Sequence, residues 1–388
     1  MVKKRKLSPQ SVWDEAALES AFTEEDIKLF HISRSHKYLT VHPEAELADI
    51  PELPLKAQAI LKQRFARFTS TVEQCHHSAA GDTTKLLIRL QDGLQVESVI
   101  MYYDTSARET DSSDGESVTG HSRATLCVSS QVGCQMGCTF CATGTMGLVA
   151  DLTAGEILEQ LVHALRVAPI QNVVFMGMGE PLNNYLAVRA AAAAMTDSKR
   201  FALRRSAVTI STVGVVPRIL ALADDLPGVS LALSLHAPTQ ELRQSIVPSA
   251  KAYKLDKLLA AVDTYQQKTK QKVFVEYVML AGVNDQPEHA RQLGALLQTR
   301  NVTLNLIPWN PIFSPSIDFS APSPGGIATF CGIVTREFGV RVTVRREKGS
   351  DIASACGQLV INSDSKRCSS SSKPLRDIED SAAPVSAR

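Results

Sequence analysis

The sequence predicts an α/β protein whose larger part is a partial (β/α)6 barrel, preceded by a small helical domain. Over residues 123–347, short apolar runs alternate with helical patterns, as parallel strands with helices outside them do. Six such units fall short of the eight that complete a barrel. A length of 388 residues leaves room for one large and one smaller domain.

The first 80 residues are expected to form the small helical domain. Residues 14–31 and 53–69 both show the apolar periodicity of amphipathic helices. The second carries Lys and Arg on its polar side, which suits RNA phosphates and equally suits a solvated surface. The basic stretch at residues 3–6 is open to three interpretations: an RNA contact, a nuclear signal or a frayed terminus.

Residues 81–122 are expected to hold a β-hairpin and a disordered insertion. Two strands, 84–90 and 94–101, flank an Asp-Gly turn signal. Glu97 lies in the second strand, where a lone glutamate ordinarily faces solvent. The segment 104–122 is rich in Ser, Asp, Thr and Gly without an apolar period, which predicts disorder.

The core is expected to consist of alternating strands and helices. The expected strands are 124–129, 172–176, 207–210, 229–234, 273–279, 303–307 and a further strand at 341–345. The expected helices are 154–167, 185–195, 215–223, 254–265, 287–297 and 326–338. Ligands of such folds bind at the carboxyl ends of the strands.

Polar residues gather at these expected strand ends. Each one alone is a common loop residue, and the glycines are the type that lets a ligand approach the backbone. Several at successive strand ends indicate a shared binding site; they are Gly179, Glu180, Ser211, Ser234, Leu235, His236 and Asn310.

Three cysteines, Cys134, Cys138 and Cys141, lie within eight residues after the first core strand. Thiolates suit iron–sulfur clusters and zinc. A four-iron cluster normally takes four cysteines, so three would leave one iron open to a small molecule. A structural zinc site usually needs a second ligand pair, and Cys356 and Cys368 each stand alone. Zinc therefore stays the less favoured alternative.

The spacing C-x3-C-x2-C, with Phe140 before the last cysteine and the flanking segments 126–134 and 142–144, resembles the RlmN/Cfr family of radical S-adenosylmethionine (SAM) RNA adenine methyltransferases. The resemblance implies a radical SAM barrel and a [4Fe-4S] cluster on the three cysteines. It also implies that the polar residues at the strand ends bind SAM.

The same resemblance implies roles for three further residues. Cys356, in the run Ala-Cys-Gly-Gln-Leu, is expected to be methylated by one SAM and to pass the carbon to RNA after radical activation by a second. Cys127 is expected to release the product by forming a disulfide with Cys356. Glu97, in Val-Glu-Ser-Val, is expected to accept the ring proton. Without the resemblance, both cysteines would be ordinary packing residues.

Three functions stay open at this point: methylation of RNA adenine at C2, Cfr-like methylation at C8, and a non-catalytic zinc-stabilised RNA-binding module. For the enzymes, the expected partners are ribosomal RNA, with transfer RNA as a second candidate, and an electron donor of the flavodoxin or ferredoxin type. The chain is expected to act as a monomer. Residues 348–362 are expected to form the loop that carries Cys356, and 363–388 a disordered tail.

Composition limits the expected partners and cellular compartment of the protein. A net charge of +1 means that any basic surface must be local. Eight cysteines, three of them in one motif, favour a reducing compartment. With no secretory h-region and no long apolar run, a cytoplasmic protein is expected. Arg204-Arg205 and Arg345-Arg346 with Lys348 are either phosphate contacts or surface charge.

Overall fold

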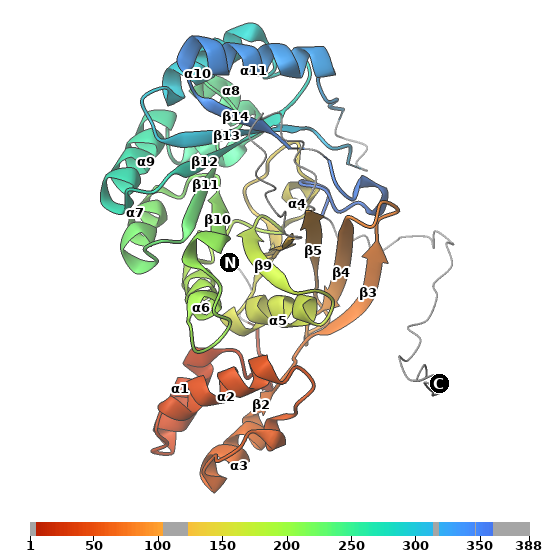
Figure 1. Cartoon of the computed structure of the whole chain (residues 1–388), viewed down its shortest axis with the longest axis vertical. Helices are drawn as coiled ribbons and strands as arrows, with labels where there is room; N and C mark the ends of the chain where they lie inside the picture. The colour runs from red at the N-terminus through yellow and green to blue at the C-terminus, as the bar shows by residue number, and fades with distance from the viewer. Residues whose placement is uncertain (1–4, 104–122, 313–317, 346, 360–388) are drawn as a thin grey trace, which may run out of the picture.

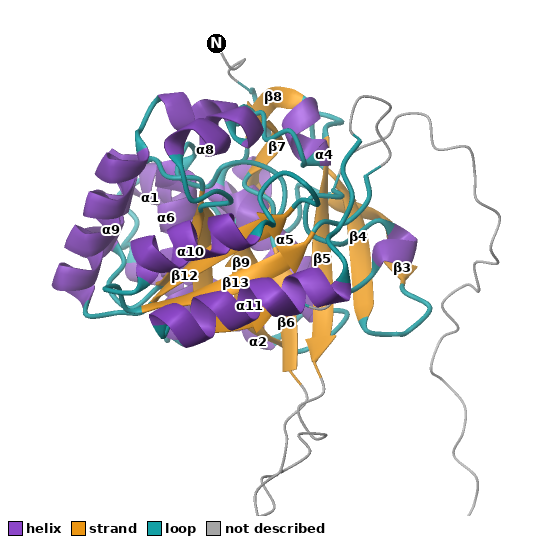
Figure 2. Cartoon of the chain, turned by 90° about the horizontal axis from the view of Figure 1, so that it is seen from above, coloured by secondary structure: helices purple, strands orange, loops and turns teal. Residues whose placement is uncertain are grey.

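The computed structural model describes residues 5–103, 123–312, 318–345 and 347–359. Within these residues, one curved sheet of ten strands runs in the order β14-β13-β12-β11-β10-β9-β6-β5-β4-β3. Helices cover its outer side (Figures 1 and 2). The expected insertion at 104–122 and the tail at 363–388 lie outside the described residues. None of the helices in the described part is long and apolar enough to cross a membrane.

The parallel part of the sheet confirms the predicted α/β barrel. Its strands are β6 (Arg123–Cys127), β9 (Ile170–Phe175), β10 (Val208–Thr212), β11 (Ser230–Ser234), β12 (Val273–Met279), β13 (Val302–Pro308) and β14 (Arg341–Val344). The helices are α5 (Ala154–Leu165), α6 (Tyr185–Thr196), α7 (Val216–Asp225), α8 (Gln240–Ile246), α9 (Leu255–Thr269), α10 (Pro287–Leu297) and α11 (Pro324–Phe338). Two short α-helices of the described core were not predicted from the sequence: α4 (Ala142–Thr145), directly after the three cysteines, and α8, on the loop after β11.

The predicted hairpin is present as β4 (Thr83–Arg89) and β5 (Gln95–Tyr103). It is joined to the barrel, because β5 pairs antiparallel with β6 and thereby extends the barrel sheet. An unpredicted edge strand, β3 (Thr71–His77), pairs with β4. Its side chains are mostly polar and exposed, so it lacks the apolar alternation that signals a strand.

The N-terminal part folds into three helices, α1 (Glu15–Glu24), α2 (Phe30–Val41) and α3 (Leu55–Arg64). The expectation of one helix over 14–31 was wrong, because the chain turns after α1 at Asp26, whose φ is +55°. The chain leaves α3 as strand β2 (Phe65–Ala66), which pairs with β1 (Gln10–Ser11).

Glu159 on α5 joins this part to the barrel. The carboxylate is fully buried and accepts the backbone N–H groups of Thr69 (3.0 Å) and Ser70 (2.9 Å). It also accepts both of their hydroxyl groups. Beside it, the ring of His163 stacks on Phe68 at 4.6 Å between centroids. The segment that follows β2 is thereby fixed to the outer surface of the barrel.

We expect Glu159→Ala to destabilise the protein by about 3 kcal/mol, because it leaves several buried donors without an acceptor. Urea unfolding followed by circular dichroism measures the change. The control is Glu19→Ala on exposed α1, which should shift the stability by less than about 0.5 kcal/mol. Equal stability of the two variants would contradict this role of Glu159.

Candidate active site

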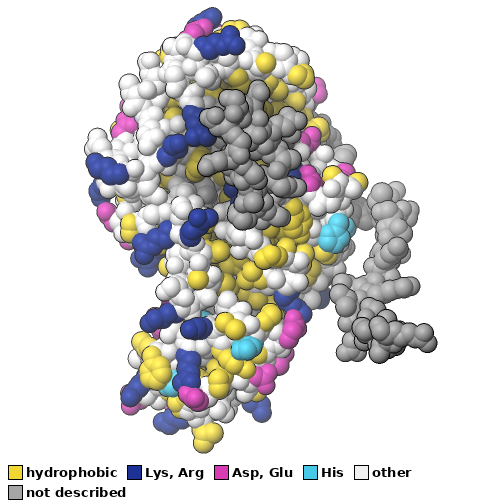
Figure 3. Space-filling view, viewed as in Figure 1, with side chains coloured by type: hydrophobic (Ala, Val, Ile, Leu, Met, Phe, Trp, Pro, Cys, Tyr) yellow, Lys and Arg dark blue, Asp and Glu magenta, His cyan; other side chains and the backbone are white. Residues whose placement is uncertain are grey.

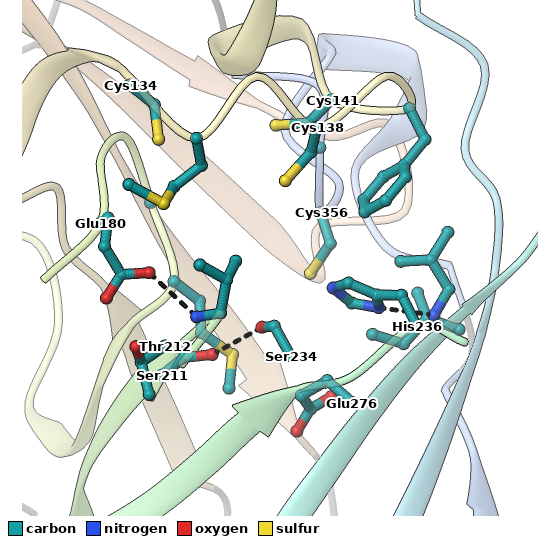
Figure 4. A pocket seen from close by; sticks show the side chains of 18 of the residues that line it. Cys134, Cys138, Cys141, Glu180, Ser211, Thr212, Ser234, His236, Glu276 and Cys356 are labelled. Carbon is teal, nitrogen blue, oxygen red and sulfur yellow. Dashed lines mark hydrogen bonds between the residues drawn. The ribbon is translucent and has the colours of Figure 1, made fainter. Parts of the chain in front are cut away.

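A cavity lies at the carboxyl ends of the parallel strands, beneath the loop that carries the three cysteines (Figure 4). About 880 Å³ within it is not filled by atoms, and part of that space is open to solvent. Cys134, Cys138 and Cys141 line one side of it. The strand-end residues line the other sides.

The cysteine loop is held by a small β-hairpin made of β7 (Gln131–Cys134) and β8 (Gly147–Asp151). Gly133 has a φ of +73°, and a Cβ there would lie 1.9 Å from the carbonyl oxygen of Gly147, so only glycine fits. Further along, the N–H of Thr139 donates to the carbonyl of Ile246 at 3.0 Å. These contacts hold the loop over the barrel mouth.

The three thiols share a buried environment. Burial raises the pKa of Cys134 to about 12 and also raises the pKa of Cys138 and Cys141. The charge of each neighbouring thiolate acts in the same direction. On their own the thiols therefore keep their protons at neutral pH, whereas a bound metal centre would displace them.

Among the described residues, no group of three or more His, Cys, Asp or Glu side chains is arranged to hold a metal ion. This finding includes Cys134, Cys138 and Cys141, so it does not distinguish a zinc site from a cluster site.

Glu180 follows β9 and contributes a buried carboxylate to the cavity wall. It accepts the N–H groups of Leu182 (3.0 Å) and Val213 (2.9 Å), and burial raises its pKa in spite of these bonds. The neighbouring Gly179 has a φ of +101°, and a Cβ there would lie 2.6 Å from the side chain of Gln131. The glycine therefore allows close packing against Gln131, and it also lines the cavity, so its expected part in binding SAM stays a prediction.

The remaining strand ends add neutral polar groups. The hydroxyls of Ser211 and Ser234 are 3.2 Å apart. His236 accepts the N–H of Val278 at 3.1 Å, and burial lowers its pKa to about 3, so the ring is neutral. Leu235 differs from the expected residues around it: it does not line the cavity, and its side chain lies in the apolar core.

The loop after β14 brings Cys356 into the same cavity. The carbonyl of Gly357 accepts the N–H of Ala142 at 2.8 Å, which ties this loop to the cysteine loop. The amide of Asn310 donates to the carbonyl of Cys356 at 3.1 Å. In Figure 4 the sulfur of Cys356 lies in the same opening as those of Cys138 and Cys141.

Cys127 and Glu97 lie beyond the lining, in the adjoining strands β6 and β5. Cys127 pairs with Val99, and Glu97, two residues earlier on β5, lies on the same face as Val99. Burial raises the pKa of Cys127 to about 12, and the nearby Cys356 adds to the effect. The carboxylate of Glu97 is buried and forms a salt bridge with Lys85 at 3.0 Å.

The sequence analysis missed two charged residues of the cavity. Arg345 was expected at a strand edge, but its guanidinium lines the cavity and contacts Cys356 and Glu276. Glu276 is the one charged residue in β12, a signal that the sequence did contain. Lys348, the other expected phosphate contact, forms a salt bridge with Asp82 at 3.1 Å.

Comparison with known proteins gives concordant results. The family model "Radical SAM superfamily" matches residues 128–293. The chain is 40% identical over 324 residues to "Ribosomal RNA large subunit methyltransferase N" of Nitrosopumilus maritimus, covering 81% of this chain and 87% of the relative. It is 43% identical over 284 residues to "Probable dual-specificity RNA methyltransferase RlmN" of Desulforudis audaxviator, covering 73% and 83%.

A crystal structure of a radical SAM methyltransferase from Sphaerobacter thermophilus has the same fold. It superposes with a TM-score of 0.79 at 35% identity, over 90% of this chain and 99% of that chain.

We expect mild oxidation of the reduced, metal-free protein to join Cys127 to Cys356, because Cys127 pairs with Val174, the neighbour of Phe175 in the cavity lining that also includes Cys356. Diamide treatment followed by peptide mass spectrometry maps the disulfide. Cys127→Ser should remove the linked peptide, and Cys331 on α11 should stay unlinked to either. Finding Cys127 fully reduced while other cysteines pair would contradict this arrangement.

Proposed function

Because the chain belongs to the RlmN family of radical SAM RNA methyltransferases, we propose that it methylates C2 of an adenine in RNA through a methylated Cys356. Ribosomal RNA is the proposed substrate, with transfer RNA as a second one. The observation that carries the proposal is the position of Cys356: its loop is hydrogen-bonded to the cysteine loop, and its sulfur shares one cavity with the three cysteine thiols.

Cys134, Cys138 and Cys141 would hold a [4Fe-4S] cluster, and two molecules of SAM would be used per turnover. The donor set supports this assignment, since three buried thiols with no fourth in the motif leave one iron for SAM. Glu180 offers a buried carboxylate for the amino group of SAM. When bound, cluster and SAM supply the one-electron chemistry that an unreactive C–H bond needs.

The protein's own groups would handle the carbon and the proton. Cys356 would carry the methyl group, and Cys127, on the adjoining strand β6, would attack its sulfur to release the product as a disulfide forms. Glu97 would take the proton from C2 of the adenine, with Lys85 holding its carboxylate in place. The target adenine must leave its stack to reach these groups.

RNA contacts would come from local basic groups. On the face in Figure 3, Lys and Arg side chains are spread over both the barrel and the N-terminal part. Helix α3 exposes Lys56 and Lys62, which would contact phosphates. An electron donor of the flavodoxin or ferredoxin type would reduce the cluster, and a single chain acting in the cytoplasm suffices for this scheme.

The same cavity would serve methylation at C8, but the relatives reported above are named for RlmN, which favours C2. A zinc-stabilised RNA-binding module is less well supported, because the relatives reported above are named as methyltransferases. It would also leave Cys356 without a role.

The test is incubation of anaerobically prepared wild type and Cys356→Ala with ribosomal RNA, SAM and a reductant. Digested RNA is then compared by mass spectrometry with 2-methyladenosine and 8-methyladenosine standards. We expect 2-methyladenosine from wild type and none from the variant, with iron and sulfide in both proteins. Formation of 8-methyladenosine would overturn the C2 assignment, and a colourless zinc protein without product would overturn the enzyme assignment.

A further inference from the structure

We propose that Arg345, held by Glu276, positions the sulfur of Cys356 for methyl transfer. The inference rests on the proposed function, in which Cys356 carries the methyl group, and it assigns a positioning role to two cavity residues.

Arg345 follows the last residue of β14 and continues its pairing, with its N–H donating to the carbonyl of Leu306 at 2.8 Å. Its side chain therefore starts from the rigid end of the sheet. One guanidinium nitrogen, Nη1, donates to Sγ of Cys356 at 3.5 Å. The other, Nη2, lies 3.5 Å from Sδ of Met176 at the end of β9.

Glu276 pairs with the guanidinium by charge, without a hydrogen bond to its Oε2. Its Oε2 lies 3.2 Å from Nη2 of Arg345, and its side chain is only 4% exposed. Its Oε1 accepts the amide of Asn305 at 2.8 Å, and Oδ1 of Asn305 accepts the hydroxyl of Thr343. A polar chain thus crosses β14, β13 and β12 and ends at the sulfur of Cys356.

The ion pair is partly buried, with 32% of the Arg345 side chain and 4% of the Glu276 side chain exposed. Removing such charges from water is costly, and a hydrophobic pair of similar size often serves stability equally well. This pair lies beside the sulfur of Cys356, to which Arg345 donates a hydrogen bond. Cys356 lies on a loop without regular structure, whose backbone is fixed by Gly357 and Asn310. The contact from Arg345 orients its side chain as well, and a correctly aimed nucleophile reacts faster.

The charge of Arg345 acts on the same step. The Cys356 thiol first loses its proton to solvent, and the resulting thiolate attacks the methyl carbon of SAM to form a sulfur–carbon bond. The bond from that carbon to the SAM sulfonium breaks, and its electron pair stays on the SAM sulfur. A hydrogen bond from the charged guanidinium is stronger to a thiolate than to a thiol, so Arg345 favours the form of Cys356 that reacts.

The first experiment uses metal-free protein and iodoacetamide, and reads alkylation of Cys356 by peptide mass spectrometry. Arg345→Met should slow alkylation about tenfold, as expected for the loss of one charge-assisted hydrogen bond. Arg345→Lys should restore part of the rate, because it returns the charge. Glu276→Gln, which keeps the shape, should give an intermediate rate.

The matched control is Arg341→Met at the exposed start of the same strand, which should alkylate like wild type. Thermal unfolding identifies any variant that does not fold. If Arg345→Met does not fold, the alkylation rates of Glu276→Gln and Arg345→Lys test the proposal instead. Wild-type rates in all folded variants would overturn the proposal.

The second experiment measures S-methylated Cys356 after cluster-loaded protein is given SAM. We expect the same order of variants as for alkylation. Equal methylation of wild type and Arg345→Met would overturn the positioning role and leave the proposed function intact. Absence of methyl-Cys356 from wild type would refute the proposed function instead, while the alkylation rates would still test the contact.

Discussion

The structure of the site depends on the contact between two loops that are far apart in the sequence. The cysteine loop donates the N–H of Ala142 to Gly357 and the hydroxyl of Thr143 to Leu359, across 216 residues in the second case. On its other side, the carbonyl of Phe140 accepts the indole N–H of Trp309 at 3.0 Å. Without these bonds, Cys356 and the three cysteines would have no fixed relation. Four thiols in one cavity are therefore a product of tertiary packing.

The sheet determines what surrounds this contact. Because β5 pairs with β6, the hairpin that carries Glu97 becomes a continuation of the barrel, and Glu97 lies on the same face as the residue paired with Cys127. At the other end, β14 and β12 supply Arg345 and Glu276. Cofactor groups thus come from the middle of the sheet. The groups proposed to handle the methyl carbon come from strands on either side of these, β6 and β5 on one side and the loop after β14 on the other.

Much of this was predictable from the sequence, for identifiable reasons. The bounds of β12 and α10 match the predictions to the residue, because a run that is apolar except for Glu276 and a helix that starts with Pro287 both give sharp signals. The cysteine spacing and the run around Cys356 placed the site. Strand β3 is polar and could not be seen, and Arg345 looked like surface charge because its partner Glu276 is distant in the sequence. The close packing of Gly179 against Gln131 joins two loops that are distant in the sequence, so no local pattern reveals it.

The central claim is that the methyl group reaches RNA by way of Cys356. The most direct measurement is a pulse–chase experiment. The protein is first methylated at Cys356 with isotopically labelled SAM, and the remaining labelled SAM is then removed. Unlabelled SAM, a reductant and RNA are added afterwards. The account predicts that the first methyladenosine formed carries the labelled carbon and that Cys356 loses its label in equal amount. Unlabelled product, with the label still on Cys356, would contradict it.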